Sequence, residues 1–178
     1  MEFRGTTICA VRRGENDVCI GGDGQVTFGE NTIMKHGAKK VRKIYDGKVL
    51  CGFAGSVSDA ITLIEKFEKK LDEHGGNLKR AAVALAQLWR SDNALRKLEA
   101  LMLAVDKEGI LLISGNGEVI EPDGDFIAIG SGGNYAYSAA KALYENTDMP
   151  AEDIVRKSLE IASSICVFTN DNISVEKL

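Results

Sequence analysis

The spacing of hydrophobic residues changes four times along this chain, and each change predicts a switch between strands and helices. Over the first 55 residues, short apolar runs bounded by turn residues are typical of strands. The hairpin dipeptide Asp46-Gly47 separates the last two of these runs. We therefore expect strands over residues 7–13, 17–22, 39–45 and 48–53.

The next part of the chain has helical spacing. Ser58 or Asp59 can cap a first helix, which the His-Gly-Gly of 74–76 ends. Asn77 can cap a second helix. The apolar positions with helical spacing are Ile61, Ile64, Phe67 and Leu71 in the first helix and Ala81, Leu85, Leu88 and Trp89 in the second.

The second half repeats this order. Strands are expected over 101–106, 110–114, 118–121 and 125–130, a helix over 135–145, another helix from about Pro150, and a strand over 173–175. Paired helices between hairpins do not give the alternating order of a parallel sheet. The pattern predicts an α+β fold in one domain: two antiparallel sheets face to face, each covered on its outer side by a helix pair, in a four-layer αββα sandwich.

Composition narrows the class of protein. With 178 residues, 44% of them hydrophobic and 27% charged, the chain suits one ordinary globular domain. Its net charge of −4 argues against nucleic-acid binding, which depends on phosphate neutralisation. No apolar run is long enough to cross a bilayer, and the opening Met-Glu-Phe-Arg lacks a signal pattern. The four cysteines have no C-x-x-C spacing, so we expect them to be reduced and buried in a cytoplasmic protein.

Two glycine-rich stretches have structural interpretations of their own. In GGDGQVTFG, at 21–29, Asp23-Gly24 is an ordinary turn dipeptide, which favours a hairpin loop. GSGGNY, at 130–135, opens a helix but lacks the lysine of a P-loop, which argues against nucleotide binding. Lys39 and Lys40 are consecutive in an expected strand, so one of them faces inward and needs a partner such as Asp23 or a catalytic role.

The candidate chemistry excludes imidazole as the base. Both histidines, His36 and His74, lie among helix-breaking residues, and no His and Cys set has metal-ligand spacing. A hydrolase built on this chain would therefore use a nucleophile whose own α-amine is the base, as an N-terminal threonine does. Thr6 and Thr7 are candidates, although a Thr-Thr pair also suits the start of a strand.

Eight stretches between Gly5 and Leu178 carry a resemblance to a known family. They are TTICAVRR, GGDGQVTFG, KHGAKKVRK, GFAGSVSDAITL, WRSDNALRKLEALML, ISGNGEVIEP, AIGSGGNYA and ICVFTND. In this order and at this spacing, they resemble the HslV (ClpQ) family of bacterial, proteasome-related threonine peptidases. The resemblance implies the fold of the N-terminal nucleophile hydrolases, with a short propeptide over 1–5 and one peptidase domain over 6–178.

The resemblance also implies a role for individual residues. Thr6 would be the first residue of the mature chain, with its hydroxyl as nucleophile and its free amine, of pKa roughly 8, as base. Lys40 matches the lysine that lowers the pKa of this amine, and Asp23 matches the carboxylate that pairs with the lysine. Gly55 matches the oxyanion-binding backbone N–H, and Ser131 matches a serine near the amine.

Members of this family bind sodium through backbone carbonyls at positions that correspond to Ser163, Cys166 and Thr169, although a glycine is often found in place of Ser163. The resemblance implies a homo-dodecamer of two stacked hexameric rings and a partner hexamer, the AAA+ ATPase HslU, which delivers unfolded proteins. The chain itself has no nucleotide motif. Two alternatives are a small-molecule N-terminal nucleophile amidohydrolase and a non-catalytic shell subunit, and the intact Thr6, Asp23 and Lys40 argue against the second.

Overall fold

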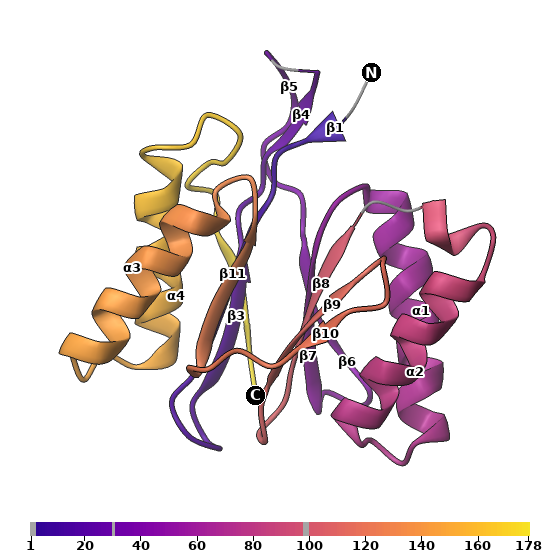
Figure 1. Cartoon of the computed structure of the whole chain (residues 1–178). Helices are drawn as coiled ribbons and strands as arrows, with labels where there is room; N and C mark the ends of the chain where they lie inside the picture. The colour runs from indigo at the N-terminus through magenta and orange to yellow at the C-terminus, as the bar shows by residue number, and fades with distance from the viewer. Residues whose placement is uncertain (1–2, 30, 98–99) are drawn as a thin grey trace.

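Two antiparallel sheets lie face to face at the centre of the molecule, with a helix pair on each outer side (Figure 1). The computed structural model describes residues 3–29, 31–97 and 100–178. Helices α1 (Val57–Glu73) and α2 (Leu78–Ser91) cover the five-stranded sheet. Helices α3 (Gly133–Asn146) and α4 (Ala151–Ser163) cover the four-stranded sheet. The predicted four-layer αββα sandwich is confirmed.

Each sheet joins strands that are distant in the sequence. The five-stranded sheet has the order β10-β9-β8-β7-β6, and the four-stranded sheet has the order β11-β2-β3-β12. The strands of the first are β6 (Val41–Ile44), β7 (Val49–Ala54), β8 (Leu101–Val105), β9 (Ile110–Ser114) and β10 (Val119–Ile120). Those of the second are β2 (Thr7–Arg12), β3 (Val18–Gly22), β11 (Phe126–Gly130) and β12 (Ser174–Lys177).

Three layers of buried apolar side chains hold these elements together. Phe67 and Trp89 belong to the layer between the first helix pair and its sheet. Ile8 and Leu103 belong to the layer between the sheets, and Leu159 to the layer under the second helix pair. Burying a large apolar side chain contributes about 1.5–3 kcal/mol, so these layers supply most of the folding free energy.

Local signals placed the turns well and the helix starts less well. A hairpin turn joins β6 and β7, as the Asp-Gly signal predicts, but it spans residues 45–48 rather than Asp46-Gly47 alone. Tyr45 and Asp46 both have φ of 51° in this turn. The Asn77 side chain accepts a hydrogen bond from the Arg80 N–H at 3.0 Å, which confirms it as the cap of α2. The expected caps Ser58 and Asp59 are wrong, because α1 already begins at Val57. Pro150 occupies the N-cap of α4 rather than its first turn.

A third, small sheet was not predicted. It consists of β1 (Phe3–Arg4), β4 (Val26–Phe28) and β5 (Thr32–Lys35) in the order β1-β4-β5. It extends away from the sandwich at the top of Figure 1. The stretch 21–29 is therefore the end of β3 and the strand β4, not a hairpin loop. All four β5 residues are exposed, so this strand has no alternation of buried and exposed positions to reveal it.

No helix among the residues that the structure describes is long and apolar enough to span a membrane. Two of the sequence predictions include residues outside the described part of the chain. They are the expected propeptide, which includes residues 1–2, and the family-like stretch over 89–103, which includes residues 98–99.

Candidate active site

Thr6 lies where the N-terminus of β2 meets the C-terminus of β11. Its carbonyl oxygen accepts a hydrogen bond from the Ser131 N–H at 2.7 Å. Antiparallel pairing of the two strands, with Gly130 opposite Thr7, fixes this position. Only 7% of Thr6 is exposed. The sequence-predicted pair of Thr6 and Ser131 is therefore brought together by sheet register, and the contact that joins them is made by the backbone.

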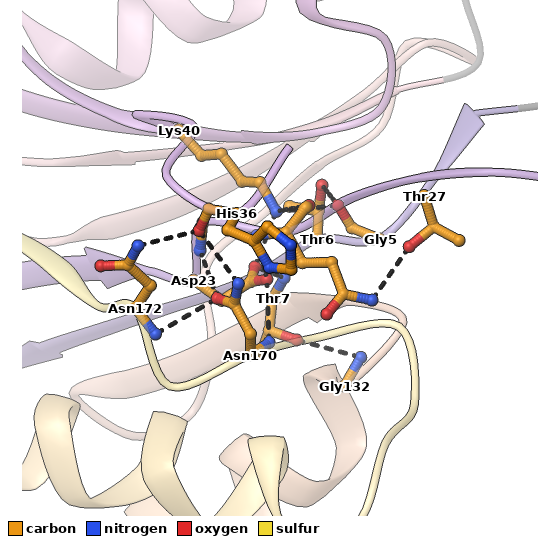
Figure 2. Close-up of polar contacts among 12 residues, drawn as sticks. Gly5, Thr6, Thr7, Asp23, Thr27, His36, Lys40, Gly132, Asn170 and Asn172 are labelled. Atoms are coloured by element: carbon orange, nitrogen blue, oxygen red, sulfur yellow. Dashed lines mark hydrogen bonds and ion pairs between the residues drawn. The ribbon is translucent and has the colours of Figure 1, made fainter. Parts of the chain in front are cut away.

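The Thr6 hydroxyl and the Lys40 ammonium converge on one oxygen. The hydroxyl donates to the Gly5 carbonyl at 2.6 Å, and Lys40 Nζ donates to the same carbonyl oxygen at 2.8 Å (Figure 2). Two donors, one of them charged, polarise the carbonyl of the Gly5–Thr6 peptide bond. In this chain the Thr6 nitrogen is part of that amide, so it is not basic.

Lys40 and Asp23 form a buried ion pair. Lys40 Nζ lies 2.8 Å from Asp23 Oδ1, and the two side chains are only 6% and 0% exposed. The ammonium also donates to the Gln25 carbonyl at 2.5 Å. Burial lowers the pKa of Lys40, while the attraction of the Asp23 carboxylate acts in the opposite direction. Neighbouring Lys39 is exposed.

A buried lysine at position 39 or 40 was predicted correctly, but the strand on which that prediction depended does not include these residues. Residues 39–40 belong to the irregular segment before β6, which begins at Val41. The alternation of a strand therefore does not decide which lysine is buried. The hydrogen bonds of Lys40 to Asp23, Gly5 and Gln25 hold it inside instead.

Backbone N–H groups surround the Asp23 carboxylate. Oδ1 accepts from the Thr7 N–H at 2.8 Å, in addition to Lys40. Oδ2 accepts from the Gln25 N–H at 2.9 Å and from the Asn170 N–H at 3.3 Å. A carboxylate with this many donors is held in one orientation.

A cavity of about 420 Å³ opens beside Thr6. Thr6, Lys40, Gly55 and Ser131 line it, so every predicted catalytic residue except Asp23 borders this space, and Asp23 lies behind Lys40. One wall is apolar and comes from β7 and α1: Phe53, Ala54, Ala60, Ile61 and Ile64. Ile61 has the helical spacing of the buried residues of α1, but 46% of it is exposed because it faces this cavity.

The predicted sodium residues lie at the end of α4 and in the turn that follows. Ser163 is the last residue of the helix, so its backbone is ordinary and a glycine is not required. Cys166 and Thr169 are buried, and the Thr169 N–H donates to the Cys166 carbonyl at 3.3 Å. Within the described part of the chain, the buried Thr169 hydroxyl has no hydrogen-bond partner.

Two residues that contact the predicted site, Gln25 and Asn170, had no role in the sequence prediction. Gln25 accepts from Lys40 through its carbonyl and donates to Asp23 through its N–H. Asn170 donates to Asp23 from the run Asn170-Asp171-Asn172, a composition typical of side chains that bond nearby backbone. Such a run after a helix marks an ordered turn, but it does not say which strand the turn will contact.

Comparison with known proteins places these features in one family. The family model described as "Proteasome subunit" matches residues 2–178. An ATP-dependent protease subunit HslV from Thermoanaerobacter pseudethanolicus is 68% identical over 176 residues, which cover 99% of each chain. The HslV of Staphylococcus carnosus is 63% identical over 173 residues, which cover 97% of this chain and 96% of the relative.

Solved structures agree with this placement. The crystal structure of a eukaryotic HslV from Trypanosoma brucei superimposes with a TM-score of 0.91 at 48% identity, and the match covers 97% of this chain and 98% of the other. BPH from Thiobacillus denitrificans, in complex with epoxomicin, gives a TM-score of 0.75 at 21% identity over 97% of each chain, a likeness of fold alone.

Proposed function

The chain belongs to the proteasome family as an HslV-type peptidase subunit of an ATP-dependent protease, and on this premise we propose that Thr6 is its nucleophile after cleavage of the Gly5–Thr6 bond. The observation that carries the proposal is the convergence of the Thr6 hydroxyl and Lys40 Nζ on the Gly5 carbonyl. That carbonyl is bonded to the nitrogen that becomes the α-amine.

The residues around Thr6 support covalent catalysis. The α-amine of mature Thr6 takes the hydroxyl proton while Oγ attacks the substrate carbonyl, forming an ester and releasing the amine half of the substrate with that proton. Water then attacks the ester and releases the acid half, which returns Thr6 to its starting state. The Lys40 charge disfavours protonation of the amine, Asp23 holds Lys40, and the Gly55 N–H stabilises the oxyanion.

The same groups support removal of residues 1–5 by the chain itself, which leaves 6–178 as the peptidase domain. Oγ of Thr6 attacks the Gly5 carbonyl carbon, the C–N bond breaks, the acyl group passes to oxygen, and the hydroxyl proton ends on the released nitrogen. Water then cleaves that ester and leaves a free amine on Thr6. The Lys40 hydrogen bond to the Gly5 oxygen supports this step, because it stabilises the negative charge that develops there. The Thr6 hydroxyl contact holds Oγ next to the same carbonyl before the attack.

We propose a cytoplasmic homo-dodecamer of two stacked hexameric rings, with HslU as the ATPase hexamer and unfolded proteins as substrates. An extended substrate is expected to bind by strand addition. The pairing of β1 with β4, Phe3 opposite Phe28 and Arg4 opposite Thr27, supports this mode, since it brings an extended segment directly to Thr6.

We also propose that Ser163, Cys166 and Thr169 hold sodium through their backbone carbonyls. Neutral oxygen ligands of this kind replace the hydration shell of alkali cations. The turn after α4 and the unpartnered, buried Thr169 hydroxyl fit such a site. Bound sodium would stabilise the turn and take no part in the chemical steps.

The experiment measures cleavage of a fluorogenic peptide and of unfolded casein by the purified chain, with and without HslU and ATP. Mass spectrometry determines the N-terminus, and native mass spectrometry determines the assembly. We expect a Thr6 terminus, a dodecamer, and casein cleavage only with the ATPase. Hydrolysis of small amides without casein cleavage would favour the amidohydrolase. A processed ring without hydrolysis of any kind would favour the shell subunit.

A further inference from the structure

The side chain of Asn170 joins three separate segments of the chain. Its Oδ1 accepts from the Gly24 N–H at 3.0 Å, and its Nδ2 donates to the His36 carbonyl at 2.9 Å. Its backbone N–H donates to Asp23 Oδ2 at 3.3 Å. Figure 2 shows this amide beside Asp23 and His36. One residue of the turn after α4 is therefore bonded to the end of β3 and to the segment between β5 and β6.

Those two segments carry Asp23 and Lys40, the members of the buried ion pair. They also contact each other directly, because the Ala38 N–H donates to the Gly24 carbonyl at 2.9 Å. A Cβ at Gly24 would collide with the His36 carbonyl oxygen, so only glycine allows the two backbones to approach this closely. The distance between Asp23 and Lys40 thus depends on how these backbones are held.

Asparagine suits this position for a chemical reason. The Gly24 N–H is a donor and the His36 carbonyl is an acceptor. An amide side chain can bond to both, because it carries an acceptor oxygen and a donor nitrogen. Aspartate would keep the acceptor but lose the donor, and its charge would face the His36 carbonyl. Alanine would lose both bonds.

We propose that Asn170 is a positioning residue for catalysis: it fixes the backbones on either side of the Asp23–Lys40 pair and so fixes Lys40 relative to Thr6. This inference rests on the proposed function. Asn170 acts through Asp23 and Lys40 and does not touch the reacting atoms.

Asn172 provides a matched control. Its Nδ2 donates to the same His36 carbonyl at 3.0 Å, and its N–H donates to Asn170 Oδ1 at 3.2 Å. It is an exposed residue of the same turn. Asn172→Ala therefore removes one hydrogen bond to the segment before Lys40, the bond to the His36 carbonyl. It leaves the bonds of Asn170 to Asp23 and Gly24 in place.

The experiment compares Asn170→Ala, Asn170→Asp and Asn172→Ala in the full chain. Mass spectrometry counts the subunits with a Thr6 terminus, and kcat is expressed per processed subunit. For Asn170→Ala we expect kcat for a fluorogenic peptide to fall by about ten- to a hundredfold with KM nearly unchanged, because misplaced catalytic groups slow chemistry more than binding. Asn172→Ala should stay within about twofold of the parent, since surface substitutions are usually mild.

Asn170→Asp supplies a readout that a purely structural role would not move. An added carboxylate in the network of Asp23 and Lys40 raises the pKa of the Thr6 amine, so the acidic limb of the kcat–pH profile should shift to higher pH. If Asn170→Ala does not fold, this profile decides the question. Equal losses in Asn170→Ala and Asn172→Ala, a change confined to KM, or an unmoved acidic limb would overturn the inference.

A Thr6→Ala variant separates this inference from the proposed function. Hydrolysis that persists in Thr6→Ala would refute the assignment of the nucleophile, whatever the Asn170 variants do. An inactive Thr6→Ala together with equal Asn170→Ala and Asn172→Ala rates would leave the nucleophile in place and refute the positioning role alone.

Discussion

Thr6 and Thr7 are identical neighbours that the structure uses in different ways. The Thr6 hydroxyl donates to the Gly5 carbonyl, which belongs to the bond whose cleavage we propose. The Thr7 hydroxyl accepts from the Gly132 N–H at 3.1 Å, at the start of α3, and the Thr7 N–H donates to Asp23. Thr6 lines the cavity, whereas the Thr7 hydroxyl joins the start of β2 to the start of α3 by a hydrogen bond.

Alanine at each threonine should therefore have a different effect. Thr6→Ala should abolish peptide hydrolysis while assembly persists, because the side chain's task is chemical. Thr7→Ala should retain substantial activity and lower the free energy of unfolding by about 1 kcal/mol, through loss of the bond to Gly132. Hydrolysis rates and denaturant unfolding of both variants provide the measurement. A dead Thr7→Ala beside an active Thr6→Ala would show that the nucleophile is one residue away.

The two lysines should differ in the same manner. Lys40→Ala should lower kcat by at least about a hundredfold, since it removes the charge that keeps the amine unprotonated. It should also lower the free energy of unfolding by about 3 kcal/mol, because it leaves the buried Asp23 carboxylate without its partner. Lys39→Ala should be mild, as Lys39 is exposed at the rim of the cavity. Equal rates for the two variants would contradict the assignment.

At the scale of elements, the sequence predicted the helices and strands whose apolar residues recur at a regular spacing. It missed the strands that have no such spacing. Helices and sandwich strands bury one face or both, and the spacing of their apolar residues reports this. The strands of the small sheet are short, and β5 is exposed throughout. Their pairing depends on contacts between Phe3–Arg4 and Val26–Phe28, which no local pattern encodes.

The residues of the candidate site also differ in whether the sequence could predict them. Thr6, Asp23 and Lys40 could be proposed from residue type and resemblance, because each belongs to a recognisable stretch. Asn170 could not, because its importance arises from a contact with Asp23 across 147 positions of sequence. A polar turn after a helix looks alike whether it contacts a catalytic carboxylate or only water.

The element β1 leads to a prediction about processing. Gly5 joins β1 to Thr6 with φ of +108°, and a Cβ there would lie 2.8 Å from the Phe168 carbonyl oxygen. Gly5→Ala should move the scissile carbonyl away from Thr6 and Lys40, so cleavage should slow by about tenfold or more. A time course of intact mass after synthesis measures it.

Gly29→Ala is the control for this substitution. Gly29 has φ of +63° in the turn after β4, but its Cβ would meet open space. Both substitutions place alanine at positive φ, but Gly29→Ala leaves the scissile bond untouched, so processing should proceed as in the parent chain. Equally slow cleavage in both variants would show that the conformation of Gly5 is not what matters.

At the scale of the whole molecule, the layered core should determine thiol chemistry. All four cysteines are free and buried. Burial raises the pKa of Cys19 and of Cys51 to about 12 and also raises the pKa of Cys9. Since the thiolate is the reactive form, these three should resist alkylation in the native protein near neutral pH.

Iodoacetamide labelling followed by peptide mass spectrometry measures this protection, with the unfolded chain as the control. All four cysteines should label in denaturant, whereas Cys9, Cys19 and Cys51 should label in the native protein only as fast as the protein unfolds. Rapid labelling of any of these three cysteines in the native protein would contradict the burial of its side chain in the core.

The amide at Thr6 has a consequence for how a cell handles this protein. On the proposed function, a newly synthesised subunit with Gly5 still attached has no basic nitrogen at position 6, so it is inactive before cleavage and needs no separate inhibitor. The cut that activates it cannot be reversed, because the released segment is not rejoined. Under this proposed mechanism each subunit is activated once, and any later control would act on the access of substrate to Thr6 rather than on the nucleophile.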